Sequence, residues 1–145
     1  MTVDLGLTPA SGKRAHVDRR IGKLMGFVAA TLVVGSFVHL AGYTPGGTKA
    51  PFDPSHAGIA EAIIGVVLAS GAIAVVRGSN RARMAAIVTT SFAILGFLVG
   101  LNMTVRGGDL ADVIYHVVML PVLIVTLILL VRTPREPVAA ERGTE

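Results

Sequence analysis

The sequence predicts an all-α protein, a four-helix transmembrane bundle with up-down-up-down topology and both termini in the cytoplasm. Three observations support this fold class. Hydrophobic residues make up 52% of the 145 residues and charged residues only 15%, which leaves too little polar surface for a soluble domain of this size. The apolar residues form four long blocks. Lys and Arg are concentrated in three of the segments outside those blocks.

Each apolar block is about as long as the roughly 20 residues with which a helix crosses a bilayer. The predicted helices cover residues 24–43, 57–76, 84–103 and 113–131. The connecting segments are short and rich in Gly, Pro, Asn, Asp and Arg, so consecutive helices should be antiparallel neighbours. The second helix has a clear start, since Asp53 is a good N-cap residue and Pro54 a good first helical residue.

The distribution of basic residues predicts the orientation, because cytoplasmic flanks of membrane helices carry an excess of Lys and Arg. Of the 13 Lys and Arg residues, only Lys49 and Arg106 lie in the first and third loops. The others lie in the N-terminal segment, the middle loop or the C-terminal tail. The sequence therefore predicts a basic cytoplasmic segment over residues 1–23 and a disordered cytoplasmic tail over residues 132–145.

Small residues recur at spacings of three and four along the second predicted helix, at Gly58, Ala62, Gly65 and Ala69. In lipid, such a stripe lets another helix approach closely. We expect the stripe to contact a neighbouring helix, and a second copy of the chain or a membrane-protein partner is the alternative. The lipid bilayer is the other expected partner of the chain. Nucleic acid is not expected, because topology already accounts for the basic residues.

Polar side chains lie near the outer end of every predicted helix. One residue from each helix lies roughly 4–10 Å below the outer interface, at a rise of 1.5 Å per residue, so the four can meet in one layer. Charged groups are costly in a bilayer, which makes such residues candidates for a functional site. The candidate ligand- or proton-binding residues are His39, Glu61, Asn102, Asp112, Tyr115 and His116.

Two interpretations of this polar layer remain open. In the first, the side chains only join the helices by hydrogen bonds, and the protein is a structural or accessory subunit of a membrane complex. In the second, the layer binds a proton or a small ligand from the outer face. Further alternatives are a metal ion held by His39, Glu61 and His116, and a haem with His39 and His116 as axial ligands.

Catalysis has little support in the sequence, and we do not expect an enzyme. The chain has no cysteine, so it offers neither a thiolate nucleophile nor a cysteine metal site. It contains no nucleophile elbow, P-loop or dinucleotide fingerprint. A solute path across the membrane is also disfavoured, because the cytoplasmic halves of the helices contain almost no polar residues beyond Ser and Thr.

Three stretches carry a resemblance to a group of known proteins: "HL" at the end of the first block, "HAGIAEAIIG" at the start of the second and "DLADVIYHVVML" at the start of the fourth. Over residues 24–131 the chain resembles small uncharacterised four-span integral membrane proteins of high-GC bacteria. The resemblance implies the four-span architecture and a bacterial inner-membrane location. It also implies His39, Glu61 and His116 as site residues, but no activity and no cofactor.

Overall fold

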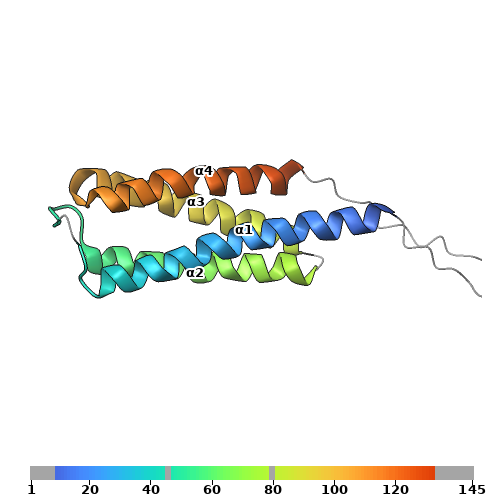
Figure 1. The fold of residues 1–145 in the computed structure, drawn as a ribbon, viewed down its shortest axis with the longest axis horizontal. Coiled ribbons are helices and arrows are strands. Elements are labelled where there is room, and N and C mark those ends of the chain that lie inside the picture. Colours follow the sequence, from blue (N-terminus) through green and yellow to red (C-terminus); the bar gives the residue numbers. More distant parts are fainter. Residues whose placement is uncertain (1–8, 45–46, 79–80, 133–145) are drawn as a thin grey trace, which may run out of the picture.

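The computed structural model describes residues 9–44, 47–78 and 81–132, with residues 9–17 described by their backbone alone. The described residues form an up-down-up-down bundle, in which each helix runs antiparallel to the one before it (Figure 1). α1 packs extensively on α2 and much less on α4. This arrangement confirms the predicted all-α four-helix bundle. The helices are α1 (Pro9–Leu40), α2 (Pro54–Arg77), α3 (Ala82–Gly107) and α4 (Leu110–Arg132).

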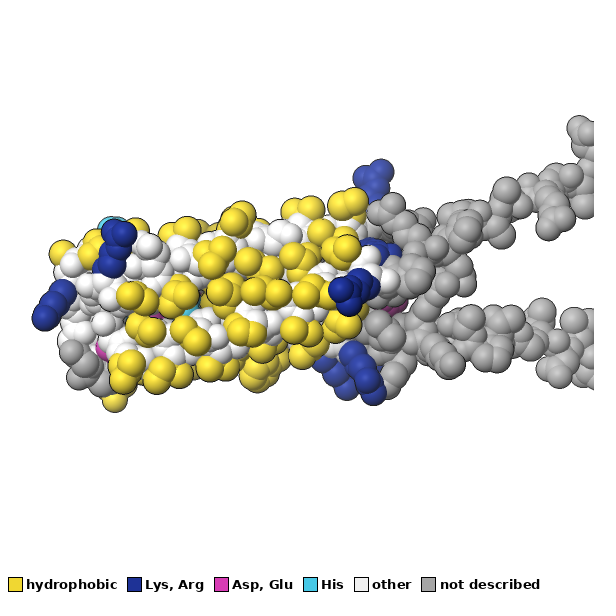
Figure 2. All heavy atoms as spheres, turned by 90° about the horizontal axis from the view of Figure 1, so that it is seen from above, with side chains coloured by type: hydrophobic (Ala, Val, Ile, Leu, Met, Phe, Trp, Pro, Cys, Tyr) yellow, Lys and Arg dark blue, Asp and Glu magenta, His cyan; other side chains and the backbone are white. Residues whose placement is uncertain are grey.

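All four helices contain a segment long and apolar enough to cross a membrane, with a mean hydropathy between 1.9 and 2.7. Large apolar side chains cover the outside of the bundle and are exposed on every helix (Figure 2). Lys and Arg side chains lie at its two ends. Apolar sides and charged ends are what a lipid bilayer requires, so the chain has the architecture of a multi-pass membrane protein.

The helices extend beyond the apolar blocks from which they were predicted, except that α1 ends at Leu40 and not at residue 43. The largest difference is in α1, which begins at Pro9, whereas the expected helix began at residue 24. The membrane-compatible part of α1 begins at Asp18. Apolarity alone misses the earlier turns, because Lys, Arg and Ala are good helix formers outside a membrane as well. The predicted disordered tail lies, from residue 133 onward, outside the described residues.

α2 begins as predicted. The Asp53 side chain accepts hydrogen bonds from the backbone N–H groups of Ser55, at 2.8 Å, and His56, at 3.3 Å. Pro54 is the first helical residue. At the other end, Gly78 has a φ of 65°, the left-handed conformation that commonly terminates a helix. The Asp53 N-cap predicted from the sequence is therefore confirmed.

The small-residue stripe of α2 packs against α1 of the same chain. A Cβ atom on Gly58 would lie 3.0 Å from the backbone oxygen of Ser36, and one on Gly65 would lie 3.3 Å from Leu32 Cβ. Both glycines are buried. The prediction that the stripe contacts another helix is thus confirmed. Because α1 occupies the stripe, its buried glycines offer no open surface to a second copy or a partner protein.

The interior differs between the two ends of the bundle. Towards the end where α1 begins and α4 ends, the terminal end, apolar side chains such as Met25, Leu68 and Leu123 fill the core. At the opposite end, the loop end, residues 41–53 connect α1 to α2. The Lys49 N–H there donates to the backbone oxygen of Gly107 at 2.8 Å, and Phe52 is buried. This loop therefore covers the part of the interior in which the polar residues lie.

Candidate ligand-binding site

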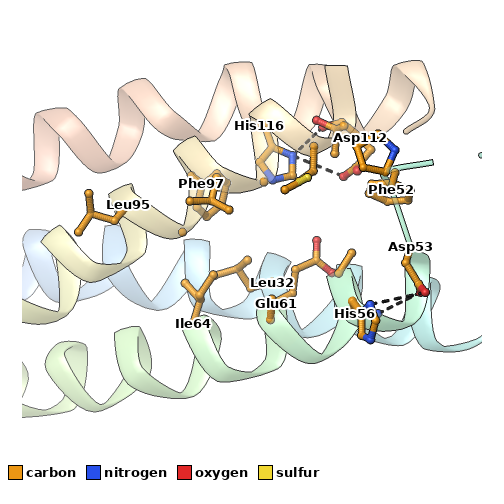
Figure 3. A pocket seen from close by; sticks show the side chains of 18 of the residues that line it. Leu32, Phe52, Asp53, His56, Glu61, Ile64, Leu95, Phe97, Asp112 and His116 are labelled. Atoms are coloured by element: carbon orange, nitrogen blue, oxygen red, sulfur yellow. Dashed lines mark hydrogen bonds and ion pairs between the residues drawn. The ribbon is translucent and has the colours of Figure 1, made fainter. Parts of the chain in front are cut away.

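Four ionisable side chains are buried together at the loop end of the bundle, and we call them the polar cluster. They come from three helices, and each is no more than 9% exposed. Figure 3 shows Glu61 on one side of an open space, with Asp112 and His116 on the other. Burial of ionisable groups inside a membrane protein is costly unless they are paired. The members of the cluster are His39, Glu61, Asp112 and His116.

A hydrogen bond between His39 and Glu61 joins α1 to α2 within the cluster. His39 Nδ1 lies 2.8 Å from Glu61 Oε2. Gly35, one turn before His39, leaves the space for this carboxylate, since a Cβ there would lie 3.1 Å from both of its oxygens. The edge of Phe52 packs against the His39 ring, with centroids 5.8 Å apart. The space left by Gly35 and the packing of Phe52 therefore hold the His39–Glu61 pair in place.

His116 is fixed by its own helix. Its Nδ1–H donates to the backbone oxygen of Asp112 at 2.9 Å and lies 3.5 Å from Asp112 Oδ1. The ring packs against Phe97, with centroids 5.2 Å apart. Gly100 on α3 makes room for it, because a Cβ at that position would overlap His116 Nε2. The tautomer with hydrogen on Nδ1 leaves Nε2 as a hydrogen-bond acceptor.

One oxygen of Asp112 is left without a hydrogen bond. Asp112 Oδ2 is fully buried and accepts no hydrogen bond from the described residues. It faces His39 Nε2 at 3.9 Å, which is too long for a hydrogen bond. A buried polar atom without a partner costs about 1–3 kcal/mol. In a cluster whose other members are paired, such an atom indicates a position for a bound ligand.

The structure brings four of the six predicted site residues into the cluster. Tyr115 lies beside it, where its hydroxyl forms a 3.0 Å hydrogen bond with Thr31 Oγ1 and joins α4 to α1. Asn102 does not take part, because it is exposed on the outside of α3. The prediction was wrong there because α3 buries the face that carries Phe97 and Thr104. Asn102 is about 200° around the helix from Thr104.

Sequence analysis also missed the residues that shape the site. Thr104 is the buried polar residue of α3 at this level, and Phe52 closes the loop end. Gly96, Gly100 and Thr104 recur every four residues, and this spacing marks the inward face of α3. No such periodic signal exists for Phe52, since it lies in a loop.

A cleft of about 560 Å³ lies between α2 and α3, and we call it the α2–α3 cleft (Figure 3). Its walls are mostly apolar, and exposed side chains of α3 form its rim. Glu61, Asp112 and His116 supply the ionisable groups of its inner wall, and Thr104 is a further buried polar residue there. The apolar lining includes Leu32, Ile64, Phe92, Leu95, Phe97 and Val99.

A second cleft, of about 530 Å³, lies between α1 and α4, and we call it the α1–α4 cleft. His39, Glu61 and Asp112 all line it, together with Asp109 near the loop end. Glu61 and Asp112 thus line both clefts, and the polar cluster forms the wall between them.

The two histidines do not line a common cleft. His116 lines the α2–α3 cleft and His39 lines the α1–α4 cleft. A haem held by both rings would need the two to face one space from opposite sides. This geometry therefore does not favour the haem alternative.

The side chains at the site can bind a ligand. The cluster offers carboxylate and imidazole groups that accept or donate hydrogen bonds or bind a cation, and the clefts offer apolar walls. No family model, no curated protein and no solved structure matches the chain.

Proposed function

We propose that this multi-pass membrane protein binds a small apolar molecule in the α2–α3 cleft, with the polar cluster holding the polar end of that molecule. The observation that carries the proposal is the composition of the cleft wall, which is mostly apolar, with Glu61, Asp112, His116 and Thr104 as its buried polar residues and the exposed Asp53 and His56 at the loop end. Ligand sites have this composition and volumes of roughly 300–1,000 Å³. Of the two ligands that the sequence leaves open, this cleft favours a small molecule over a proton.

The polar group expected on the ligand follows from the hydrogen-bonding state of His116. Because His116 Nδ1–H donates to the Asp112 backbone, Nε2 is left to accept a hydrogen bond. A hydroxyl group at the end of the ligand would satisfy it. The rest of the ligand is expected to be apolar and to enter from the bilayer, because Phe92, Leu95 and Val99 combine exposure to lipid with a place in the cleft wall.

We further propose that the membrane is a bacterial inner membrane and that the polar cluster lies in its outer half. The excess of Lys and Arg at the terminal end supports this orientation. The resemblance to four-span proteins of high-GC bacteria supports the choice of membrane.

The test is to identify what the purified protein carries. The chain is isolated in nanodiscs and extracted with organic solvent, and the extract is analysed by mass spectrometry. Ala60→Phe fills the α2–α3 cleft from an exposed wall position, and Ile59→Phe is the matched control, exposed on the same helix but outside the cleft wall. We expect about one bound molecule per wild-type chain, a loss of tenfold or more in Ala60→Phe, and no loss in the control.

A different result would support the structural interpretation. If the wild type carries only bulk lipid in the proportions of the surrounding membrane, the proposal fails. A companion protein recovered at equal stoichiometry, with both clefts empty of any retained molecule, would identify the chain as an accessory subunit.

A further inference from the structure

We propose that the polar cluster also binds one divalent transition-metal ion, held by one atom each from His39, Glu61 and Asp112. These three residues come from α1, α2 and α4. Each offers a ligand atom, and the three atoms lie within 4.8 Å of one another. All three side chains are buried. The proposed metal site shares Glu61 and Asp112 with the wall of the α2–α3 cleft, but it does not depend on a ligand being bound there.

The unpartnered oxygen of Asp112 is an independent sign of a ligand at this position. The Asp112 side chain is only 8% exposed, and Oδ2 is the oxygen that lacks a hydrogen bond. It faces His39 Nε2 across a gap of 3.9 Å. Two zinc ligands at about 2.0–2.2 Å from the ion, at a tetrahedral angle, stand about 3.4 Å apart. The gap would therefore close by only a few tenths of an ångström around an ion.

The charge of the cluster favours a cation. Among the described residues, the ion-pair partners of Glu61 and Asp112 are histidines, which are uncharged unless they are protonated. Two buried carboxylates without a permanent positive partner are costly inside a membrane protein. A divalent ion would neutralise both. Imidazole and carboxylate ligands together suit zinc-like ions, whereas carboxylates and carbonyls alone suit magnesium or calcium.

The sequence suggested His39, Glu61 and His116 as metal ligands, and the proposed site has Asp112 in place of His116. His116 Nδ1 is engaged with the Asp112 backbone oxygen, and His116 is not among the residues whose ligand atoms lie within 4.8 Å of one another. His116 is instead a positioning residue for the site, since its Nδ1 lies 3.5 Å from Asp112 Oδ1 and leaves Oδ2 for the ion. Hydrogen-bonding groups behind the ligands commonly fix the orientation of ligating side chains in metal sites.

The α1–α4 cleft provides the route for the ion. All three proposed ligands line this cleft, and Asp109 lies in its wall near the loop end. An acidic residue on the approach attracts cations from the aqueous side. The metal route and the proposed small-molecule cleft therefore reach the polar cluster from opposite sides.

Cobalt(II) is the probe for this site, because its visible absorption reports ligand binding directly. Purified full-length protein in detergent, with any polyhistidine tag removed, is titrated with Co²⁺ after treatment with a chelator. We expect one Co²⁺ per chain with visible absorption bands. Asp112→Asn, which keeps the shape of the side chain, should weaken binding at least tenfold, and His39→Ala should do the same.

His56→Ala is the matched control, because His56 and Asp53 form a similar histidine–acid pair in an exposed position, with Nδ1 and Oδ2 3.5 Å apart. It should change Co²⁺ affinity less than twofold. Circular dichroism establishes that each variant is folded before its affinity is compared. The proposal is overturned if the folded wild type binds no Co²⁺, or if His56→Ala weakens binding as much as Asp112→Asn does.

A variant of the α2–α3 cleft separates the two proposals. Ala60→Phe should leave Co²⁺ binding unchanged, since Ala60 lines the α2–α3 cleft and not the α1–α4 cleft. Normal Co²⁺ binding with no molecule extracted from the wild-type cleft would refute the proposed function alone. An extracted molecule without Co²⁺ binding would refute the metal site alone.

Discussion

His39 of α1 and Glu61 of α2 form a 2.8 Å hydrogen bond inside the bundle, at a point where Gly35 gives the carboxylate its space. The bond is more than 90% buried on both sides. It lies next to a close contact of the two helices, where a Cβ on Gly58 would be 3.0 Å from the Ser36 backbone oxygen and 3.2 Å from His39 Cβ. Two helices in lipid that pack this closely can use a polar pair of this kind to fix their register.

The first prediction concerns the energy of this pair. Glu61→Gln and His39→Ala should destabilise the protein non-additively, with a coupling energy of about 0.5–3 kcal/mol, as for residues that share one network. Unfolding of both single variants and the double variant in detergent measures the coupling. Combining Glu61→Gln with His56→Ala should give additive effects, since His56 pairs with Asp53. Additive effects for His39 and Glu61 would show that the bond is not formed.

The second prediction concerns Gly35. Gly35→Ala should destabilise the protein by about 1–3 kcal/mol, because Glu61 cannot retreat from the new methyl group without stretching its bond to His39. Gly26→Ala on the same helix is the control, since a Cβ there has no neighbour within 4 Å. The control should be neutral, or more stable by up to about 1 kcal/mol. Equal thermal stability of the two variants would argue against a close contact at Gly35.

Sequence reasoning was strongest where periodicity or a local rule applies. Four apolar blocks give four helices, and Asp53 followed by Pro54 gives the start of α2. The depth of each polar residue along its helix can also be calculated, which is why His39, Glu61 and His116 were expected in one layer. The structure places all three there.

The direction in which each side chain points was harder to predict. Asn102 has the right depth but lies on the exposed face of α3, whereas the buried face is the one marked by the spacing of Gly96, Gly100 and Thr104. The metal ligands proposed from the structure differ from those suggested by the sequence for the same reason. Only the three-dimensional structure shows that Asp112 Oδ2 faces His39. The covering position of Phe52 depends on the path of a loop, which composition does not specify.

The third prediction tests the contact between α1 and α4, the least extensive of the neighbouring helix pairs. Tyr115→Phe removes the 3.0 Å hydrogen bond to Thr31 and should cost about 0.5–1.5 kcal/mol. The cost stays modest because Thr31 keeps its 2.8 Å bond to the Val28 backbone. Tyr43→Phe is the control, since Tyr43 is 66% exposed. Unfolding in detergent compares the two, and an equal effect would argue against the Tyr115–Thr31 bond.

The last prediction concerns orientation in the membrane. The described ends of α1 and α4 lie together at the terminal end (Figure 1), so a single labelling experiment fixes the orientation of the whole bundle. The chain has no cysteine, so introduced thiols react without background. We expect Thr48→Cys, in the loop between α1 and α2, to react with an impermeant maleimide added to intact cells. Ser79→Cys, between α2 and α3 in the sequence, should react only after the cells are permeabilised.

The physical reason for this expectation is that only Lys49 and Arg106 belong to the first and third loops, whereas the other Lys and Arg residues belong, in the sequence, to the N-terminal segment, the middle loop and the C-terminal tail. A membrane-permeant maleimide is the control and should label both variants in intact cells. Reaction of Ser79→Cys alone with the impermeant reagent would invert the bundle. The polar cluster would then lie in the cytoplasmic half of the membrane, and the proposed metal ion would reach it from the cytoplasm through the α1–α4 cleft.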